Sequence, residues 1–453
     1  MYKNSNTFID YIGNLRNKNY NKDKDRYENL NFPSSQAKKS HFFTQEGNSV
    51  SSIANINGYN YSRLQPSQSQ QIPQKYNYHY SSLIESNFNK QIDNRKKNED
   101  YLSNLKLNQR SVVNKNELNS IIFSKIGLNN LGNTCYMNTG LQNLIHSKDF
   151  IERLLSKKSL IDSNITPITK QFLNLCQNIS NSGTKSIKPE DFKYYFSKKH
   201  SEYRGYGEHD TQEFCRILLE DMNKELNEIS KKGKYKELST KNKSKRECDE
   251  EFDELFRSRE SSIVIDSFYG QIINIFTCKC GYEDYSFQKV MDLPLLLPGG
   301  ESSVKVEDLL YEYFKEDIIK FNTKCEECLR KREHKKEIKF SQPPNILILS
   351  LQRIDLRTNR KNNCSVIFSE KLEIKEYIDE DCANRYDYKY KLYGISCYSW
   401  LVKEAHYYAF IKINDKDWYE FNDSKVTYYG EEINIKKIYS SVYALFYKKE
   451  KNY

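Results

Sequence analysis

The distribution of apolar and polar residues divides the chain into a helical part followed by a β part. After Asp210, apolar residues recur three and four positions apart, as on one face of an amphipathic helix: Phe214, Ile217, Leu218, Met222 and Leu226. The residues that follow Cys135 have the same spacing: Met137, Leu141, Leu144 and Ile145. This periodicity predicts a mainly helical region from about residue 127 to residue 230.

From about residue 262 onward, the apolar residues come in short runs instead. Residues 346–351, 391–396 and 407–413 are runs of this kind, rich in Ile, Leu, Tyr and Phe, and they are typical of strands. A helical pattern over residues 306–318 interrupts them. We therefore expect an α+β fold in which a helical subdomain faces a β subdomain.

The first 120 residues differ from the rest in composition. They are poor in aliphatic residues and rich in Asn, Ser, Gln, Lys and Tyr, so they cannot bury a core, and residues 1–120 are predicted to be a disordered low-complexity tail. Asn, Lys, Ile and Tyr are frequent throughout, which indicates the codon bias of an AT-rich genome. The alternative is that the tail carries a targeting or partner-binding motif, although none is legible.

The formal net charge of +10 comes mostly from this tail and from lysine-rich segments such as 230–237 and 241–246. Such runs are typical of solvated loops. Nucleic-acid binding needs basic and aromatic residues interleaved on an ordered surface, so it is the weaker alternative, and a salt-dependent shift with nucleic acid would favour it.

The sequence also bears on the cellular compartment. The N-terminus lacks the apolar core of a signal peptide, and no apolar run approaches the roughly 18 residues of a membrane helix. Eleven cysteines, an odd number spread over a long chain, favour free thiols and metal ligands over a disulfide framework. We expect a soluble protein of the cytoplasm, the nucleus or both, with no membrane partner.

Cys135 stands out among the cysteines because of its neighbours. Within the segment 127–140, glycines and asparagines are concentrated in the residues before Cys135 and predict an irregular turn. Helical spacing of apolar residues begins after this turn. Cys135 is then the first residue of a helix, where main-chain N–H groups and the helix dipole stabilise a thiolate. A lone cysteine is often a small core residue, but this setting favours a nucleophile.

A base for this nucleophile can be sought among the seven histidines. His406 stands between two strand-like runs, so it would be held at a strand edge, whereas an isolated histidine before a strand is usually structural. A further strand ends in Asn422 and Asp423, whose side chains could orient an imidazole. The order of cysteine, distant histidine and then Asn or Asp is that of a papain-like triad.

Two cysteine pairs predict a metal site. Cys278 and Cys280 share one short turn, and Cys325 and Cys328 share another, so four thiolates could hold one tetrahedral zinc. Only one residue separates the first pair, where zinc knuckles usually have two. The alternative is that the pairs are vestigial or that only one is intact.

Four blocks of the chain resemble those of the ubiquitin-specific proteases. In chain order they are similar to the Cys box (127–140), the acidic Gln/Asp block (208–219), the proline-led core strand (342–353) and the His box (405–409 with 418–426). The acidic block has the form closest to the herpesvirus-associated subgroup. The resemblance covers residues from about 126 to 449.

The resemblance implies a papain-like cysteine protease domain over 126–449, with a helical thumb, a β-rich palm and zinc-bearing β fingers at about 262–340. The implied activity is thiol-dependent hydrolysis of isopeptide or peptide bonds at the C-terminal glycine of ubiquitin. Ubiquitin and ubiquitinated proteins would be the partners. The two cysteine pairs would hold a structural zinc at the tip of the fingers, and no catalytic cofactor is implied.

The resemblance also implies catalytic roles. Cys135 would be the nucleophile and His406 its base. Asn422 occupies the position that holds the imidazole, with Asp423 as a neighbour that could share or assume this role. Asn130 matches the oxyanion donor, which helps to stabilise the tetrahedral intermediate.

Two further positions match residues that bind substrate in the family. Asp210 lies where the family contacts the basic tail of ubiquitin, and Tyr407 follows the histidine of the His box. The alternative for Asp210 is a helix N-cap, because Glu213 stands at the third helical position as in a capping box. Both roles are compatible.

The chain departs from the family pattern in two places. Glu404 and Ala405 stand where the family has two glycines beside the narrow groove for the ubiquitin tail, and a side chain there costs space. Thr139 and Gly140 replace a commoner serine and a bulkier residue, and a helical glycine costs about 1 kcal/mol relative to alanine. The alternative function is therefore a low-activity or inactive ubiquitin-binding scaffold, which ubiquitin binding without labelling by a reactive ubiquitin probe would favour.

Overall fold

A computed structural model describes residues 113–450, apart from short gaps at 164–166, 233–235, 237, 242, 300–302, 321–323, 331–332, 356–359, 384–385, 402–403 and 434–436. The chain divides into two units, 1–101 and 102–453, and the described residues all belong to the second. The predicted tail therefore lies outside the described residues as far as residue 112.

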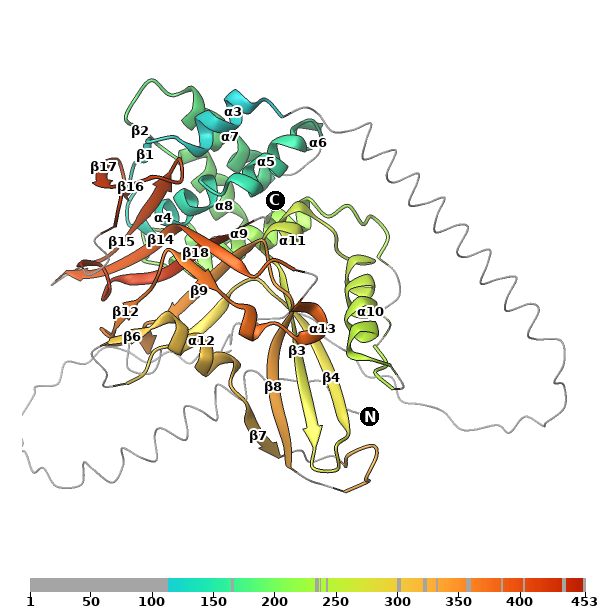
Figure 1. The fold of residues 1–453 in the computed structure, drawn as a ribbon. Helices are drawn as coiled ribbons and strands as arrows, with labels where there is room; N and C mark the ends of the chain where they lie inside the picture. Colours follow the sequence, from blue (N-terminus) through green and yellow to red (C-terminus); the bar gives the residue numbers. More distant parts are fainter. Residues whose placement is uncertain are drawn as a thin grey trace, which may run out of the picture. The chain divides into compact units, whose positions relative to one another are not determined.

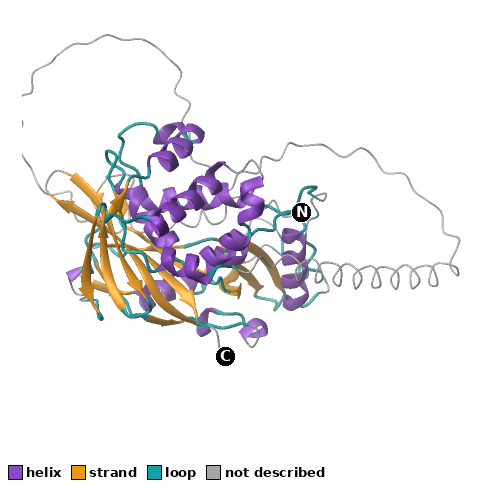
Figure 2. Ribbon diagram, turned by 90° about the horizontal axis from the view of Figure 1, so that it is seen from above, coloured by secondary structure: helices purple, strands orange, loops and turns teal. Residues whose placement is uncertain are grey.

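The helical part confirms the prediction for residues 127–230 and extends it at both ends (Figures 1 and 2). Its helices are α3 (Lys115–Ile122), α4 (Cys135–Ile145), α5 (Lys148–Ser156), α6 (Lys158–Ser163), α7 (Pro167–Asn181), α8 (Glu190–Lys199), η2 (Ser201–Tyr203), α9 (Thr211–Glu225), α10 (Lys245–Arg257) and α11 (Ile263–Phe268). The tail boundary at residue 120 was wrong, because α3 already buries Leu118. None of the helices in the described part of the chain is both long and apolar enough to cross a membrane.

The β part contains a main sheet of eight strands. Its order is β17-β16-β15-β14-β18-β9-β5, with β13 paired to β14. All the pairs are antiparallel except β5 with β9. The strands are β5 (Leu293–Leu296), β9 (Ile346–Gln352), β13 (Lys371–Glu373), β14 (Lys389–Leu401), β15 (Glu404–Ile413), β16 (Asp417–Asn422), β17 (Lys425–Gly430) and β18 (Val442–Lys449).

A second sheet, which we call the finger sheet, extends away from the main sheet (Figure 1). It has the order β4-β3-β8-β7, from β3 (Gly270–Cys278), β4 (Glu283–Val290), β7 (Asp317–Lys320) and β8 (Glu333–Gln342). The helix predicted over 306–318 was too long: α12 (Val306–Phe314) ends four residues earlier, and Ile318 lies in β7. The predicted finger segment 262–340 also includes α11, which packs with the helices, and β5 of the main sheet.

The remaining elements are short. They are the strand pairs β1 (Gly127–Leu128) with β2 (Ser186–Ile187), β6 (Ser303–Lys305) with β12 (Ser365–Ile367) and β10 (Ile354–Asp355) with β11 (Arg360–Lys361), and the helices η3 (Lys375–Tyr377) and α13 (Glu380–Ala383). Together with the two sheets and the helices, they confirm the α+β class.

Strand β9 is buried on both faces of the main sheet, which explains its unbroken apolar run. Ile346 and Ile348 pack against the helical part, whereas Leu347 and Leu349 pack on the other face, where α12 lies. Successive side chains of a strand point to opposite faces, so each face receives every second residue.

Helix α4 is buried along its whole length between the main sheet and α9. A Cβ atom on Gly140 would come within 2.8 Å of the Cys215 sulfur on α9, and one on Gly394 of β14 would collide with the Asn143 side chain of α4. The glycine that weakens α4 as an isolated helix is therefore required for its close packing.

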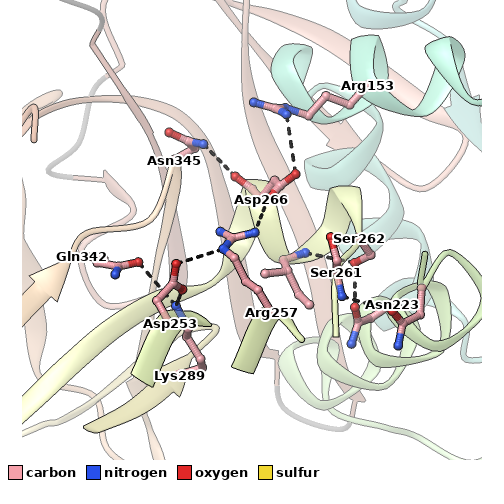
Figure 3. Close-up of polar contacts among 12 residues, drawn as sticks. Arg153, Asn223, Asp253, Arg257, Ser261, Ser262, Asp266, Lys289, Gln342 and Asn345 are labelled. Atoms are coloured by element: carbon pink, nitrogen blue, oxygen red, sulfur yellow. Dashed lines mark hydrogen bonds and ion pairs between the residues drawn. The ribbon is translucent and has the colours of Figure 1, made fainter. Parts of the chain in front are cut away.

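A network of charged side chains joins the base of the finger sheet to the helical part (Figure 3). Lys289 of β4 contacts Asp253 of α10 at 2.6 Å, and its side chain is only 6% exposed. Arg257 also binds Asp253, at 3.0 Å, and reaches Asp266 of α11 at 2.9 Å. Burial lowers the pKa of Lys289 and Asp253 opposes this effect, so the lysine depends on its partner to remain charged.

We predict that Asp253→Ala lowers the free energy of unfolding by about 3 kcal/mol, because it leaves Lys289 buried without its carboxylate. Glu250→Ala on the same helix is the control, since its ion pair with Arg246 is exposed and such pairs contribute about 0–1 kcal/mol. Urea unfolding followed by circular dichroism measures both. Equal losses would show that the network does not stabilise the junction.

Candidate active site

Cys135 is the first residue of α4, as predicted, and it is 7% exposed. The turn before it has left-handed backbone at Gly132 (φ 102°) and Asn133 (φ 50°). The side-chain oxygen of Asn130 accepts hydrogen bonds from the main-chain N–H groups of Gly132 (2.9 Å) and Thr134 (3.1 Å). This turn presents the thiol at a helix N-terminus, the electrostatic setting in which a thiolate is stabilised.

The β part brings an imidazole to this thiol. His406 of β15 lies beside Cys135 and interacts with it, and its Nε2 lies 2.8 Å from Oδ1 of Asn422, the last residue of β16. The Asn422 oxygen accepts from Nε2, which leaves Nδ1 for the sulfur. The structure thus brings together Cys135, His406 and Asn422, which are separated by up to 287 positions in the chain.

The protonated form of His406 is stabilised in this arrangement. The interaction with Cys135 is the main cause that raises the pKa of His406 to about 9, burial opposes it, and the bond with Asn422 adds to the rise. A thiolate beside an imidazolium is the form in which a cysteine acts as a nucleophile.

Asp423 does not hold the imidazole by a hydrogen bond in this structure. Its Oδ2 accepts from the Asn130 side-chain amide (3.0 Å), and its Oδ1 accepts from that of Asn138 (2.8 Å). Its charge still contributes to the raised pKa of His406, as the smallest of the causes. Of the two neighbours proposed for the triad, Asn422 is therefore the one bonded to the histidine.

Asp210 and Tyr407 lie together beside the nucleophile helix. The Oδ1 atom of Asp210 caps α9 by accepting from the main-chain N–H groups of Gln212 (2.6 Å) and Glu213 (3.0 Å), and Oδ2 accepts from the hydroxyl of Tyr443. Tyr407 is 5% exposed, and its ring packs against that of Tyr443 with centroids 5.4 Å apart. The cap expected for Asp210 is present, and Tyr407 supports it from within the core.

The four cysteines predicted as metal ligands form one cluster at the tip of the finger sheet. All four sulfurs lie within 4.8 Å of one another, with Cys278 3.9 Å from Cys328 and Cys280 3.7 Å from Cys325. Four thiolates about 2.3 Å from a tetrahedral zinc are about 3.8 Å apart, so the cluster fits a metal such as zinc. Gly281 (φ 90°) closes the tight first turn, because its N–H donates to the Cys278 carbonyl at 2.8 Å.

Sequence reasoning missed two residues of the site. Asn138 stands one helical turn after Cys135, and this spacing alone was a signal that it faces the same side of α4. Tyr443, which binds Asp210 from 233 positions away, left no local signal. Glu404 and Ala405 begin β15, but their side chains lie outside the described part of the structure.

A cysteine at a helix N-terminus, an imidazole beside it and an amide that orients the imidazole define a cysteine hydrolase of the papain-like class. Residues 126–447 match the family described as ubiquitin carboxyl-terminal hydrolase. The chain belongs to this family.

Among curated proteins, the chain is 30% identical over 318 residues to ubiquitin carboxyl-terminal hydrolase 2 of Homo sapiens, which covers 66% of this chain and 52% of that one. It is 27% identical over 363 residues to ubiquitin carboxyl-terminal hydrolase 4 of Saccharomyces cerevisiae, which covers 71% of this chain and 39% of that one. The chain thus spans about half or less of the length of these relatives.

The SAGA Ubp8/Sgf11/Sus1/Sgf73 DUB module, solved with bound ubiquitin aldehyde, contains a chain of the same fold. The TM-score is 0.58 at 21% identity, and the match covers 74% of this chain and 71% of that one. This likeness confirms the thumb, palm and finger architecture expected from the sequence.

We predict that Cys135→Ala lowers the pKa of His406 from about 9, because it removes the interaction that raises this pKa most. Cys176→Ala, at a buried cysteine of α7, is the control and should leave the pKa near 9. NMR titration of the imidazole, assigned through His406→Gln, measures the shift. If the His406 pKa is the same in wild type, Cys135→Ala and Cys176→Ala, the thiol does not contact His406.

Proposed function

We propose that this chain is a deubiquitinase that hydrolyses isopeptide or peptide bonds at the C-terminal glycine of ubiquitin. The observation that carries the proposal is the position of His406, which lies beside Cys135 and is bonded to Asn422 at 2.8 Å. Membership of the ubiquitin carboxyl-terminal hydrolase family supports this substrate.

In the proposed reaction, the Cys135 thiolate attacks the carbonyl carbon of the terminal glycine. The tetrahedral intermediate collapses as the C–N bond breaks, and His406 donates its proton to the leaving amine. Water then attacks the thioester while His406 accepts a proton, and the C–S bond breaks, which releases the ubiquitin carboxylate and restores the Cys135 thiolate. The amide of Asn130 and main-chain N–H groups near Cys135 stabilise the oxyanion of each intermediate.

The proposed partners are ubiquitin and ubiquitinated proteins. Asp210 provides a carboxylate, fixed by its helix cap and by Tyr443, that suits the basic tail of ubiquitin, and Tyr407 keeps it in place. We assign the acidic block around Asp210 to the herpesvirus-associated form. We place the protein in the cytoplasm, the nucleus or both, which its eleven free cysteines support.

We further propose that the cysteine cluster binds a structural zinc, which would fold the fingertip. Purified chain should contain about one zinc per molecule by mass spectrometry of the metal. Cys328→Ser should lower the zinc content and the thermal stability together, whereas Cys382→Ala, outside the cluster, should keep the metal. Full stability without any metal would contradict the proposal.

We predict that the purified chain releases a fluorophore from the C-terminus of ubiquitin and that Cys135→Ala abolishes this release. Asn422→Ala should lower kcat but retain activity, since it removes the orienter and not the nucleophile. Cys176→Ala is again the control. If wild-type chain binds ubiquitin without turnover, the protein is a ubiquitin-binding scaffold instead.

A further inference from the structure

The amide of Asn130 is held in one orientation by its own loop. Its oxygen accepts from two main-chain N–H groups, those of Gly132 and Thr134, and from the Thr134 hydroxyl at 3.3 Å. Oxygen must therefore face the loop and nitrogen must face away from it. The side-chain NH₂ group points to Asp423, to which it donates one of its two hydrogens at 3.0 Å.

Asp423 receives a second amide from the interior. Asn138 is 2% exposed, and its nitrogen lies 2.8 Å from Oδ1 of Asp423 and 3.1 Å from the main-chain oxygen of Leu128. Asn138 thus contacts the strand before the nucleophile loop and the turn after β16 at the same time. It acts from the first turn of α4, three residues after Cys135.

The main chain reinforces the same junction. The N–H group of Leu128 donates to the carbonyl of Asp423 at 2.9 Å. A Cβ atom on Gly127 would collide with the main chain of Ser424, so glycine permits the two segments to touch. Asp423 itself has left-handed backbone (φ 49°), which turns its carboxylate away from the direction of Asn422.

We propose that Asn138 is a positioning residue, which acts through Asp423 on the amide of Asn130. This proposal rests on the function proposed above. The buried Asn138 amide holds the carboxylate, and the carboxylate holds the exposed Asn130 amide beside Cys135. The hydrogen bonds that the Asn130 oxygen accepts polarise its amide, so that the second N–H group is a stronger donor to a developing oxyanion.

We call the contacts from Asn138 through Asp423 to Asn130 the relay. It gives two adjacent residues different roles. Asn422 orients the imidazole, whereas Asp423, held by Asn138, orients the oxyanion donor. A change at Asn138 should therefore affect the rate of the chemical step more than ubiquitin binding. It should leave the NMR pKa of His406 close to that of wild type, whereas Asn422→Ala should lower that pKa.

The test uses ubiquitin with a C-terminal fluorophore and the variant Asn138→Leu, which keeps the shape and loses the donor. We expect kcat to fall about 10- to 100-fold with KM within about threefold, less than the ~10²- to 10³-fold cost of deleting an oxyanion donor. In an Asn130→Ala background, Asn138→Leu should cause no further loss, because its effect passes through that amide. Additive losses would overturn the relay.

Asn223→Leu is the matched control. Asn223 of α9 is also a buried asparagine that donates to a carboxylate, that of Glu260 (3.2 Å), but it lies outside the contact between α4 and the main sheet. It should lose stability and keep kcat within about threefold. If Asn138→Leu does not fold, Asp423→Asn is the second variant for the test. It should also lower kcat, and it should cause no further loss of kcat when it is combined with Asn130→Ala.

A separate measurement distinguishes failure of the relay from failure of the proposed function. Absence of turnover in wild type would reject the deubiquitinase, and the NMR signal of the Asn130 side-chain amide then decides on the relay. A shift of this signal in Asn138→Leu, and none in Asn223→Leu, supports the relay. An unmoved signal overturns it.

Discussion

The close contact between helix α4 and the main sheet is the constraint on which the site depends. Cys135 begins this helix, and His406 lies on β15, one of the strands against which the helix packs. Small residues make the approach possible, since a side chain at Gly394 would meet Asn143 and one at Gly140 would meet α9. Because the two reacting groups come from opposite sides of this contact, sub-ångström changes in its packing alter the distance between them.

The end of β16 and the turn after it contact both the imidazole and the nucleophile segment. Asn422 ends the strand and reaches the imidazole, while Asp423 leaves the strand in a left-handed conformation and reaches two asparagines of the nucleophile segment. Because Asp423 lies outside the strand and has a different backbone conformation from Asn422, the two neighbouring residues can serve different groups. The carbonyl of Asp423 also binds the main chain of Leu128, which joins the histidine half of the site to the cysteine half.

The finger sheet is held in two different ways along its length. At its base, Lys289, Asp253 and Arg257 connect it to α10 and α11 through partly buried charges. At its tip, two short turns bring four thiols together, in a region where few apolar side chains are available to form a core. A metal ion can supply the folding energy that so small a core cannot.

Local sequence determined the elements whose cause is local. The periodic apolar residues of α9, the cap at Asp210 and the start of α4 at Cys135 follow from hydrogen bonding and burial within a few residues. The sequence pattern predicts no element where α10 lies, because this helix is mostly charged and is stabilised by ion pairs with distant elements.

Only the tertiary structure decided which distant side chains meet. It assigned the imidazole to Asn422 and the Asn130 amide to Asp423, it joined Tyr443 to Asp210, and it closed the cysteine cluster. Sequence pattern fixes which face of a strand or helix a residue occupies. Which partner it meets across that face depends on strand register and on how closely two elements pack. Both depend on residues that are far apart in the sequence, so local pattern cannot predict them.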